Sequence, residues 1–422
     1  MSGVDWVLAT VGLALLLVAV ISQRLSNTPI TPPMVVVAAG ILLGPLAFDS
    51  VTVGPTSATV RKLAEATLAV VLFSDASRID LRALRRSASI PSRLLGIGLP
   101  LTIVLGAAAA LLIFPSFSLS EALILGVILA PTDAGLGSAV VTDARLPQRV
   151  RQSLNVESGL NDGICVPVLL IVLATAPGAP GAHPAQVIGE ELGYGLIAGL
   201  SAGALAGLLV NGAGARGLIE SSWRQIIPVA AAALAYGIAE GLGGSGFIAA
   251  FTAGGLFGLI VREETGEMMR FTEEAGALLD TVTFLVFGAV LLGPSLEHVS
   301  WQIALYAVLS LTVARMLPVA LSLWGSARAP TVAFVGWFGP RGLASIVFAV
   351  IVEDTGQAHG STLLTATYVT VGLSVLLHGL SAAPLVDRYA AWFSAAPEVK
   401  GTIESGSVPE HRIRRRLGLT HG

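Results

Sequence analysis

Long apolar runs fill almost the whole of this sequence and restrict the chain to a membrane fold. Charged residues make up only 12% of its 422 residues, about half the share found in soluble domains, and the mean hydropathy is +0.80. Because a helix needs about 20 apolar residues to cross a bilayer, we predict an all-α polytopic membrane protein with about 13 transmembrane helices. The helices are expected at about residues 5–22, 32–48, 62–77, 90–114, 119–142, 153–175, 186–211, 223–240, 245–261, 276–294, 300–324, 330–352 and 362–386.

No soluble domain interrupts the apolar runs, so the predicted organisation is simple. We expect a single transmembrane domain over residues 1–394 and a short basic tail over residues 395–422, which contains HRIRRRLG. The polar break near residues 262–276 is predicted to be an interfacial connecting helix. The 48 glycines predict a tightly packed bundle, because small residues let membrane helices approach one another closely.

Basic residues occur mainly in alternate connections between the predicted helices. The odd-numbered connections hold Arg24, Arg78, Arg82, Arg85, Arg86, Arg93, Arg145, Arg149, Arg151, Arg216, Arg224, Arg262, Arg270 and Arg328. Even-numbered connections are nearly free of positive charge, with Arg61 and Lys62 as the exception and Glu190 and Glu191 as typical members. Since short loops rich in Lys and Arg stay in the cytoplasm, we expect a multi-pass protein of the cell membrane (inner or plasma membrane). Its N-terminus is predicted to lie outside and its C-terminus in the cytoplasm.

Two of the predicted helices are interrupted near their middle. The fifth contains Pro131, which removes a backbone donor and clashes with the preceding turn, followed by Asp133. The twelfth contains Gly-Pro-Arg-Gly at residues 339–342. Helices seven positions apart run in opposite directions, which is typical of inverted-topology repeats whose paired discontinuous helices mark a binding site. Simple kinks in packed helices are the alternative, but an ionisable residue inside each break favours a site.

The sixth predicted helix carries polar side chains on one face. Glu157 and Asn161 are four residues apart and so share a face, and Asp162 lies beside it. Oxygen donors of this kind are preferred by hard cations. The predicted donors are Thr132, Asp133, Glu157, Ser158, Asn161 and Asp162. The chain has no HExxH, CxxC or nucleotide-binding loop, so we predict no transition-metal site, no nucleotide and no cofactor.

Arg341 needs a partner, because an unpaired buried charge is costly. Glu157 is its predicted partner in a structural ion pair. Acids outnumber bases in this predicted core, so we expect at least one carboxylate, Asp133 or Asp162, to bind a cation or a proton.

These residues and their surroundings resemble the monovalent cation:proton antiporter family, which includes the NhaP sodium/proton antiporters and the animal sodium/proton exchangers. The matching segments are GILLGP (40–45), PTDAGLGSAVVTD (131–143), ESGLND (157–162), GGSGFIAAFTAGG (243–255) and GPRGLASI (339–346). The resemblance extends to about Phe393. It implies a homodimer with a dimerisation subdomain and a mobile core subdomain, which is built around the crossed, unwound fifth and twelfth helices of an NhaA-like fold.

The resemblance also implies roles for individual residues. Asp162 matches the acid that binds the ion and carries the proton, with Asn161 as its neighbour in the motif, and Glu157 and Arg341 match a structural ion pair. The implied sodium ligands are Asp162, Ser158 and Thr132, with Asp133 in the same site. One departure concerns the third helix, where the family often has a glutamate in a segment like LFFEGG and this chain has Asp75 in VVLFSDASRID.

The function expected from these residues is secondary active transport and not enzymatic catalysis. A buried carboxylate such as Asp162 needs a counter-charge, so a proton and a sodium or lithium ion would compete for it during alternating access. An asparagine at position 161 resembles the electroneutral type, which exchanges one cation for one proton. A potassium/proton antiporter of the same fold is the alternative. An intramembrane aspartyl protease with Asp133 and Asp162 as its dyad, or a passive channel, are more remote. The partners expected are the transported ions and the lipid bilayer, with no nucleic acid.

Overall fold

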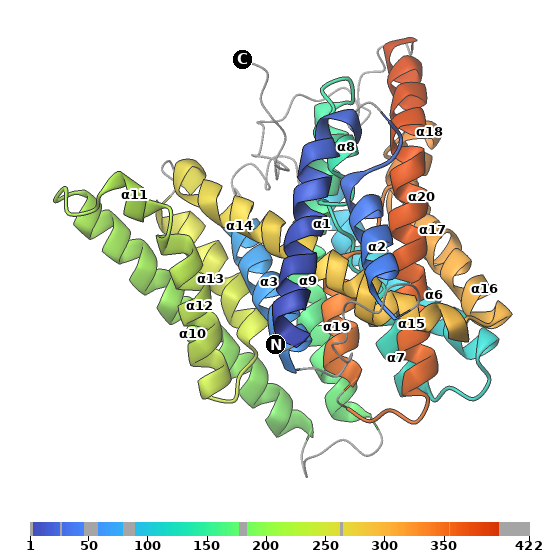
Figure 1. Ribbon diagram of the computed structural model, residues 1–422, viewed down its shortest axis with the longest axis horizontal. Helices are drawn as coiled ribbons and strands as arrows, with labels where there is room; N and C mark the ends of the chain where they lie inside the picture. Colours follow the sequence, from blue (N-terminus) through green and yellow to red (C-terminus); the bar gives the residue numbers. More distant parts are fainter. Residues whose placement is uncertain are drawn as a thin grey trace.

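The computed structural model describes residues 3–25, 28–45, 58–78, 89–176, 184–261, 265–353 and 355–395. The regular structure within these ranges is entirely helical (Figure 1), as predicted. Six helical stretches are long and apolar enough to cross a membrane, and several shorter apolar helices lie among them. Apart from Ala395, the predicted basic tail lies outside the described residues, and so do most of the arginines that follow the third predicted helix.

The two interrupted helices form one part of the bundle. The fifth predicted helix is divided into α7 (Leu119–Ile128) and α8 (Ser138–Val141), and the twelfth into α18 (Ala329–Trp337) and α19 (Leu343–Glu353). Helix α7 rises about 15 Å, half of a typical hydrocarbon core, so neither break is a simple kink. The α7–α8 and α18–α19 pairs run in opposite directions (Figure 1). The neighbouring α9 (Gln148–Thr175) and α20 (Gly360–Ala395) are continuous.

Helices α10 (Pro184–Gly214), α12 (Ile227–Gly241) and α13 (Gly246–Val261) pack together on one side of the molecule, with α3 (Ala58–Ser77) against α13 (Figure 1). Glycines permit this packing. A Cβ at Gly199 would lie 2.6 Å from the Ala249 carbonyl oxygen, and one at Gly254 would overlap the Phe73 carbonyl. The predicted close packing of small residues is therefore present here.

Two further groups of helices and one short helix complete the bundle. Helices α1 (Gly3–Leu25) and α2 (Pro32–Leu43) lie beside α14 (Thr265–Val286), which continues through a π-helical segment η3 (Phe287–Leu292) into α15 (Gly293–Ser295) and η4 (Leu296–His298). Helix α5 (Ser89–Arg93) continues through η1 (Leu94–Gly98) into α6 (Leu99–Ile113), and this element packs against α16 (Trp301–Leu311) and α17 (Val313–Ser322). A short α11 (Ser221–Arg224) precedes α12.

The predicted interfacial helix near residues 262–276 is not a separate element. From Thr265 the chain forms the start of α14 and continues without a break into the apolar part of that helix. Residues 262–264 lie outside the described part of the chain. Arg270 and Glu274 are exposed on α14 while the helix continues, so a change in composition did not mark the end of a helix here.

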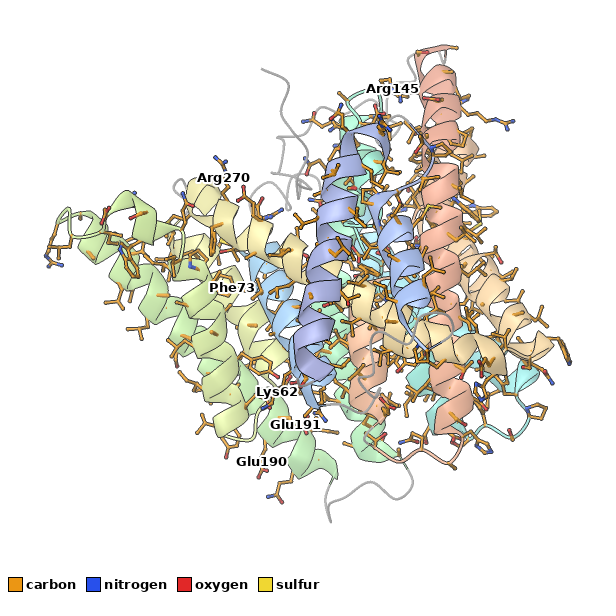
Figure 2. The ribbon with its side chains drawn as sticks, in the orientation of Figure 1. Lys62, Phe73, Arg145, Glu190, Glu191 and Arg270 are labelled. Atoms are coloured by element: carbon orange, nitrogen blue, oxygen red, sulfur yellow. The ribbon has the colours of Figure 1, made fainter. Side chains whose placement is uncertain are left out.

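The charged ends of the bundle agree with the alternation of basic residues. Figure 2 places Arg145 and Arg270 at one end of the molecule and Lys62, Glu190 and Glu191 at the other. Arg145 follows the fifth predicted helix and Arg270 the ninth, so both belong to the odd-numbered connections.

Candidate functional site

The two helix breaks meet inside the bundle through their backbones. The Asp133 amide donates to the Pro340 carbonyl over 2.7 Å. The residues of the second break, 338–342, are all buried. Non-helical backbone at membrane depth must be surrounded by protein or line a cavity, and here each break supplies part of the other's surroundings.

Arg341, from the second break, donates hydrogen bonds to backbone carbonyls that follow the first half-helix, α7. Its Nη1 donates to the carbonyl oxygens of Ala130 (2.5 Å) and Pro131 (3.1 Å), and Ser345 Oγ donates to the Ile128 carbonyl over 2.7 Å. The last carbonyls of a helix have no partner within the helix and form the negative end of its dipole. The guanidinium group therefore compensates the carboxyl end of α7.

Asp133, from the first break, makes the reciprocal contact with the second half-helix. Its Oδ2 accepts from the Leu343 amide over 3.2 Å, at the amino end of α19, and its Oδ1 accepts from the amides of Gly135 (2.6 Å) and Leu136 (3.3 Å). A Cβ at Gly342 would overlap Asp133 Oδ2, so only glycine allows this approach. The positive end of α19 and the carboxylate thus stabilise each other.

Two side chains of helix α20 make hydrogen bonds at the second break. Ser374 Oγ accepts from the Arg341 amide over 2.7 Å. His378 is buried and lies between two carbonyls, with Nε2 2.8 Å from Trp337 O and Nδ1 2.9 Å from Ser374 O. Sequence reasoning missed both residues, because a serine and a histidine in an apolar helix give no indication of which backbone they contact.

The polar face of α9 lies against the first break, as the spacing predicted. Ser158 Oγ donates to the Thr132 carbonyl over 2.5 Å and accepts from the Ala134 amide over 2.6 Å. Asn161 Nδ2 donates to Thr132 Oγ1 over 2.8 Å. Asn161 is only 1% exposed, and among the described residues its Oδ1 has no hydrogen-bond partner. The neighbouring Asp162 is 8% exposed.

The predicted ion pair between Glu157 and Arg341 is wrong. Glu157 instead pairs with Arg315 of α17, whose Nη1 and Nη2 lie 2.5 and 2.9 Å from Oε1 and Oε2. Arg341 is fully buried, and in the described part of the chain its Nε and Nη2 make no hydrogen bond. Main-chain carbonyls at a helix end carry partial negative charge and can serve as the partners of a guanidinium group, and a sequence does not indicate such contacts.

Arg315 is a further residue near the site that was not predicted from the sequence. It lies within the predicted apolar run 300–324, where a charge is rare and marks a functional or structural site. Its presence also weakens the argument that acids outnumber bases in the core, since Arg315 is buried as well as Arg341.

Asp75 lies close to this face of α9. It is half-buried on α3, and a Cβ at Gly159 would lie 3.4 Å from the Asp75 Cβ. Gly159 is one turn before Asp162 on α9, so Asp75 stands beside the polar face although it is displaced from the position of the family glutamate.

A small cavity adjoins the first break. Its volume is about 10 Å³, about the space that one water molecule requires. Its polar walls are formed by Thr132, Asp133 and Ser158, and its lining also includes Phe338 and Pro340 of the second break.

Comparison with known proteins places the chain among cation transporters. The family model described as the sodium/hydrogen exchanger, transmembrane, matches residues 11–388. The K+/H+ antiporter NhaP of Alkalimonas amylolytica is 26% identical over 404 residues, covering 91% of this chain and 67% of the relative. The Na+/H+ antiporter of Schizosaccharomyces pombe is 26% identical over 268 residues, covering 57% of this chain and 55% of the relative. The chain thus spans about two thirds and about half of the lengths of these proteins.

A solved structure shares the fold. The sodium proton antiporter MjNhaP1 from Methanocaldococcus jannaschii, determined at pH 8, superposes with a TM-score of 0.76 at 19% identity, covering 92% of this chain and 100% of that one. The family model covers most of the chain and includes both helix breaks and α9. The chain belongs to the sodium/hydrogen exchanger family.

Proposed function

We propose that this protein exchanges a monovalent cation, sodium first and lithium as a second substrate, for protons across the membrane. The observation that carries the proposal is the buried carboxamide oxygen of Asn161, next to Asp162, which has no hydrogen-bond partner among the described residues. Leaving a buried acceptor unsatisfied costs about 1–3 kcal/mol. A bound cation would remove that cost.

The proposed cation ligands are Asp162, Thr132 and Ser158, with the Asn161 oxygen added. A hydroxyl oxygen has two lone pairs. Ser158 Oγ uses one to accept from Ala134, and Thr132 Oγ1 uses one to accept from Asn161. Each hydroxyl therefore keeps a lone pair for a cation, and oxygen-only ligands suit a hard ion.

Competition for Asp162 would couple the two fluxes. A bare carboxylate is disfavoured inside the membrane, so the empty site needs either a cation or a proton before it can move. We assume that the core subdomain moves the site from one side of the membrane to the other only when Asp162 holds a cation or a proton. The cation and the proton then cross the membrane in opposite directions. A difference of one pH unit then supplies about 1.4 kcal/mol for each proton, equivalent to about a tenfold cation gradient.

Asp133 has a positioning role in this proposal and is not a second carrier. Its two oxygens accept three backbone hydrogen bonds, from Gly135, Leu136 and Leu343. This arrangement holds the two breaks together and leaves Asp162 as the single exchanging acid. One proton for one cation is the stoichiometry that follows, and it moves no net charge.

The membrane location, oligomeric state and orientation that we propose follow from the membership of the chain in this family and from the distribution of its basic residues. We place the protein in the cell membrane as a homodimer, with Arg145 and Arg270 at its cytoplasmic end, the N-terminus outside and residues 395–422 as a cytoplasmic tail after a single transmembrane domain. Potassium/proton exchange by the same fold is the alternative, since one relative is a K+/H+ antiporter.

Proton flux in proteoliposomes tests the proposal. The purified protein is reconstituted with a pH-sensitive dye inside, and sodium, lithium and potassium salts are added in turn. We expect cation-driven proton movement in the wild type and none in Asp162→Asn, which keeps the shape of the side chain and loses its charge. Asp387→Asn is the matched control, because Asp387 lies at the surface and contacts Arg145. Equal proton flux in wild type and Asp162→Asn would refute the assignment.

A further inference from the structure

His378 lies within α20, which runs beside α18 (Figure 1). The side chain is buried, with 3% of the residue exposed. An ionisable residue inside a membrane helix is costly and usually has a function, and the ion exchange proposed at Asp162 gives His378 no role. The contacts of its imidazole ring indicate what that role is.

The imidazole ring connects the end of the half-helix α18 to α20. Nε2 lies 2.8 Å from the carbonyl oxygen of Trp337, the last residue of α18. Nδ1 lies 2.9 Å from the carbonyl oxygen of Ser374 and 3.2 Å from its Oγ. The last carbonyls of a helix have no partner within the helix. The ring therefore provides a hydrogen bond at the point where α18 stops, beside the one that the Gly339 amide donates to the same oxygen.

The indole ring of Trp337 fixes the orientation of the imidazole. The two rings are stacked, with 5.2 Å between their centroids and 29° between their planes. The indole is itself held in place, because its Nε1 donates to Ser381 Oγ over 2.9 Å. Stacking restricts rotation of the imidazole, so its two nitrogens keep facing Trp337 and Ser374.

The surroundings of the ring favour its neutral form. Helices α2, α8, α16 and α18 all pack against α20 and contain no Asp, Glu, Lys, Arg or His. The charged groups that act on the ring are two buried arginines, Arg341 and Arg315, and positive charge nearby disfavours a protonated histidine. A carbonyl only accepts hydrogen bonds, so the contact with Trp337 requires the proton on Nε2. Nδ1 is then an acceptor, to which the Ser374 hydroxyl can donate.

Ser374 extends this chain of contacts to the second break. Its Oγ accepts from the Arg341 amide over 2.7 Å, and the Arg341 guanidinium donates to the carbonyls of Ala130 and Pro131. Hydrogen bonds thus run from the end of α18 through His378 and Ser374 to Arg341 and the end of α7. Members of such a buried network depend on one another.

We propose that His378 is a positioning residue for ion exchange, acting as a neutral bridge between Trp337 and Ser374 that holds the second break and, through Arg341, the first. This inference rests on the proposed exchange function. The proposed cation ligands come from the first break and from α9, and none comes from α18 or α20. Loss of the bridge should therefore slow the movement of the site across the membrane more than it weakens cation binding.

Transport by His378→Gln and His378→Leu tests this role in the full-length protein in proteoliposomes. Glutamine keeps one N–H donor and one acceptor oxygen, whereas leucine has neither. We expect His378→Leu to lower the maximal rate of cation-driven proton flux about tenfold. Its KM for the cation should stay within about twofold of wild type. His378→Gln should restore most of the rate and keep the pH profile of wild type.

Ser381→Ala is the matched control, because Ser381 lies one turn further along α20 and contacts the indole of Trp337 rather than the second break. It should keep the rate of wild type. The proposal is overturned if His378→Leu exchanges ions at the rate of wild type, if Ser381→Ala slows exchange as much as His378→Leu, or if His378→Gln is as slow as His378→Leu. A shifted pH profile in His378→Gln would also overturn it, because the ring would then titrate during transport.

Thermal unfolding in detergent tests the hydrogen-bond chain without transport. His378→Leu and Ser374→Ala should each lower Tm. The double variant should lower Tm by less than the sum of the two effects, since both changes break the same chain. Fully additive losses would contradict the bridge. If wild type itself shows no cation-driven flux, the proposed exchange function fails, and the Tm comparison still decides whether His378 and Ser374 act together.

Discussion

Glu157 and Arg315 form a two-bond ion pair inside the bundle, with each side chain only 3% exposed. The pair joins α9, which carries Asn161 and Asp162, to α17, which precedes the second helix break. A buried ion pair adds little net stability, but removing one partner strands the other charge in a medium that cannot solvate it.

Replacing Arg315 should therefore destabilise the protein strongly. We expect Arg315→Ala to lower the free energy of unfolding by about 3–5 kcal/mol, because it leaves the Glu157 carboxylate without a counter-ion. Adding Glu157→Gln should recover part of the loss. Chemical unfolding of the two single variants and the double variant in detergent micelles measures the coupling.

The control for this cycle is Arg341, the partner expected from the sequence. Arg341→Gln should also be destabilising, since it removes the donor to the Ala130 and Pro131 carbonyls. Its effect should be nearly additive with that of Glu157→Gln. Strong coupling with Arg341 and none with Arg315 would contradict the observed pairing.

Gly342→Ala should disrupt the crossing of the two breaks. The new methyl group would overlap Asp133 Oδ2, which also accepts from the Leu343 amide. We expect a lower Tm and loss of cation-driven proton flux together. Gly255→Ala is the matched control, because a Cβ there meets nothing within 4 Å, and it should behave as wild type. If both variants transport equally well, Asp133 does not hold the breaks at this distance.

Asp75 is expected to affect cation affinity without carrying the proton. It lies beside Gly159, one turn from Asp162 on α9, where a negative charge would attract an entering cation. Asp75→Ala should raise the apparent KM for sodium several-fold and leave the maximal rate nearly unchanged, as measured by proton flux over a range of sodium concentrations. Asp75→Glu should restore the lower KM. A KM equal to that of wild type in Asp75→Ala would remove Asp75 from the cation pathway.

A single exchanging acid predicts transport that does not respond to membrane voltage. Both oxygens of Asp133 are occupied by backbone amides, so one proton should leave for each cation that enters. Sodium-driven proton flux should have the same rate whether a valinomycin–potassium clamp sets the voltage to zero or to a negative value. A reversal point that shifts with voltage would mean that a second proton moves and that Asp133 carries it.

The aspartyl protease alternative finds no support in the geometry of the first break. A catalytic dyad needs two carboxyl groups that share a proton, whereas Asp133 uses its oxygens to accept from the amides of the two breaks. The membership of the chain in a transporter family agrees with this conclusion.

Local chemistry in the sequence was sufficient to predict that the chain is helical, where its two breaks lie and which face of α9 is polar, but the count of 13 helices is not confirmed. A helix must satisfy its own backbone inside lipid, so the apolar runs had to be helical. Pro131 and Pro340, each close to an ionisable residue, marked where the helices stop. The four-residue spacing of Glu157 and Asn161 fixed which side chains share a face, because helical periodicity depends only on neighbouring residues.

Only the tertiary structure decided which buried groups are partners. Glu157 and Arg315 are 158 positions apart, and Arg341 is a similar basic residue that sequence spacing cannot distinguish from it. The choice depends on the fold bringing Arg315 of α17 to Glu157 of α9 and on the carbonyls that Arg341 finds at the carboxyl end of α7. The role of Asp133 was decided in the same way, because the amides that it accepts from include Leu343, at the start of a helix from the other half of the chain.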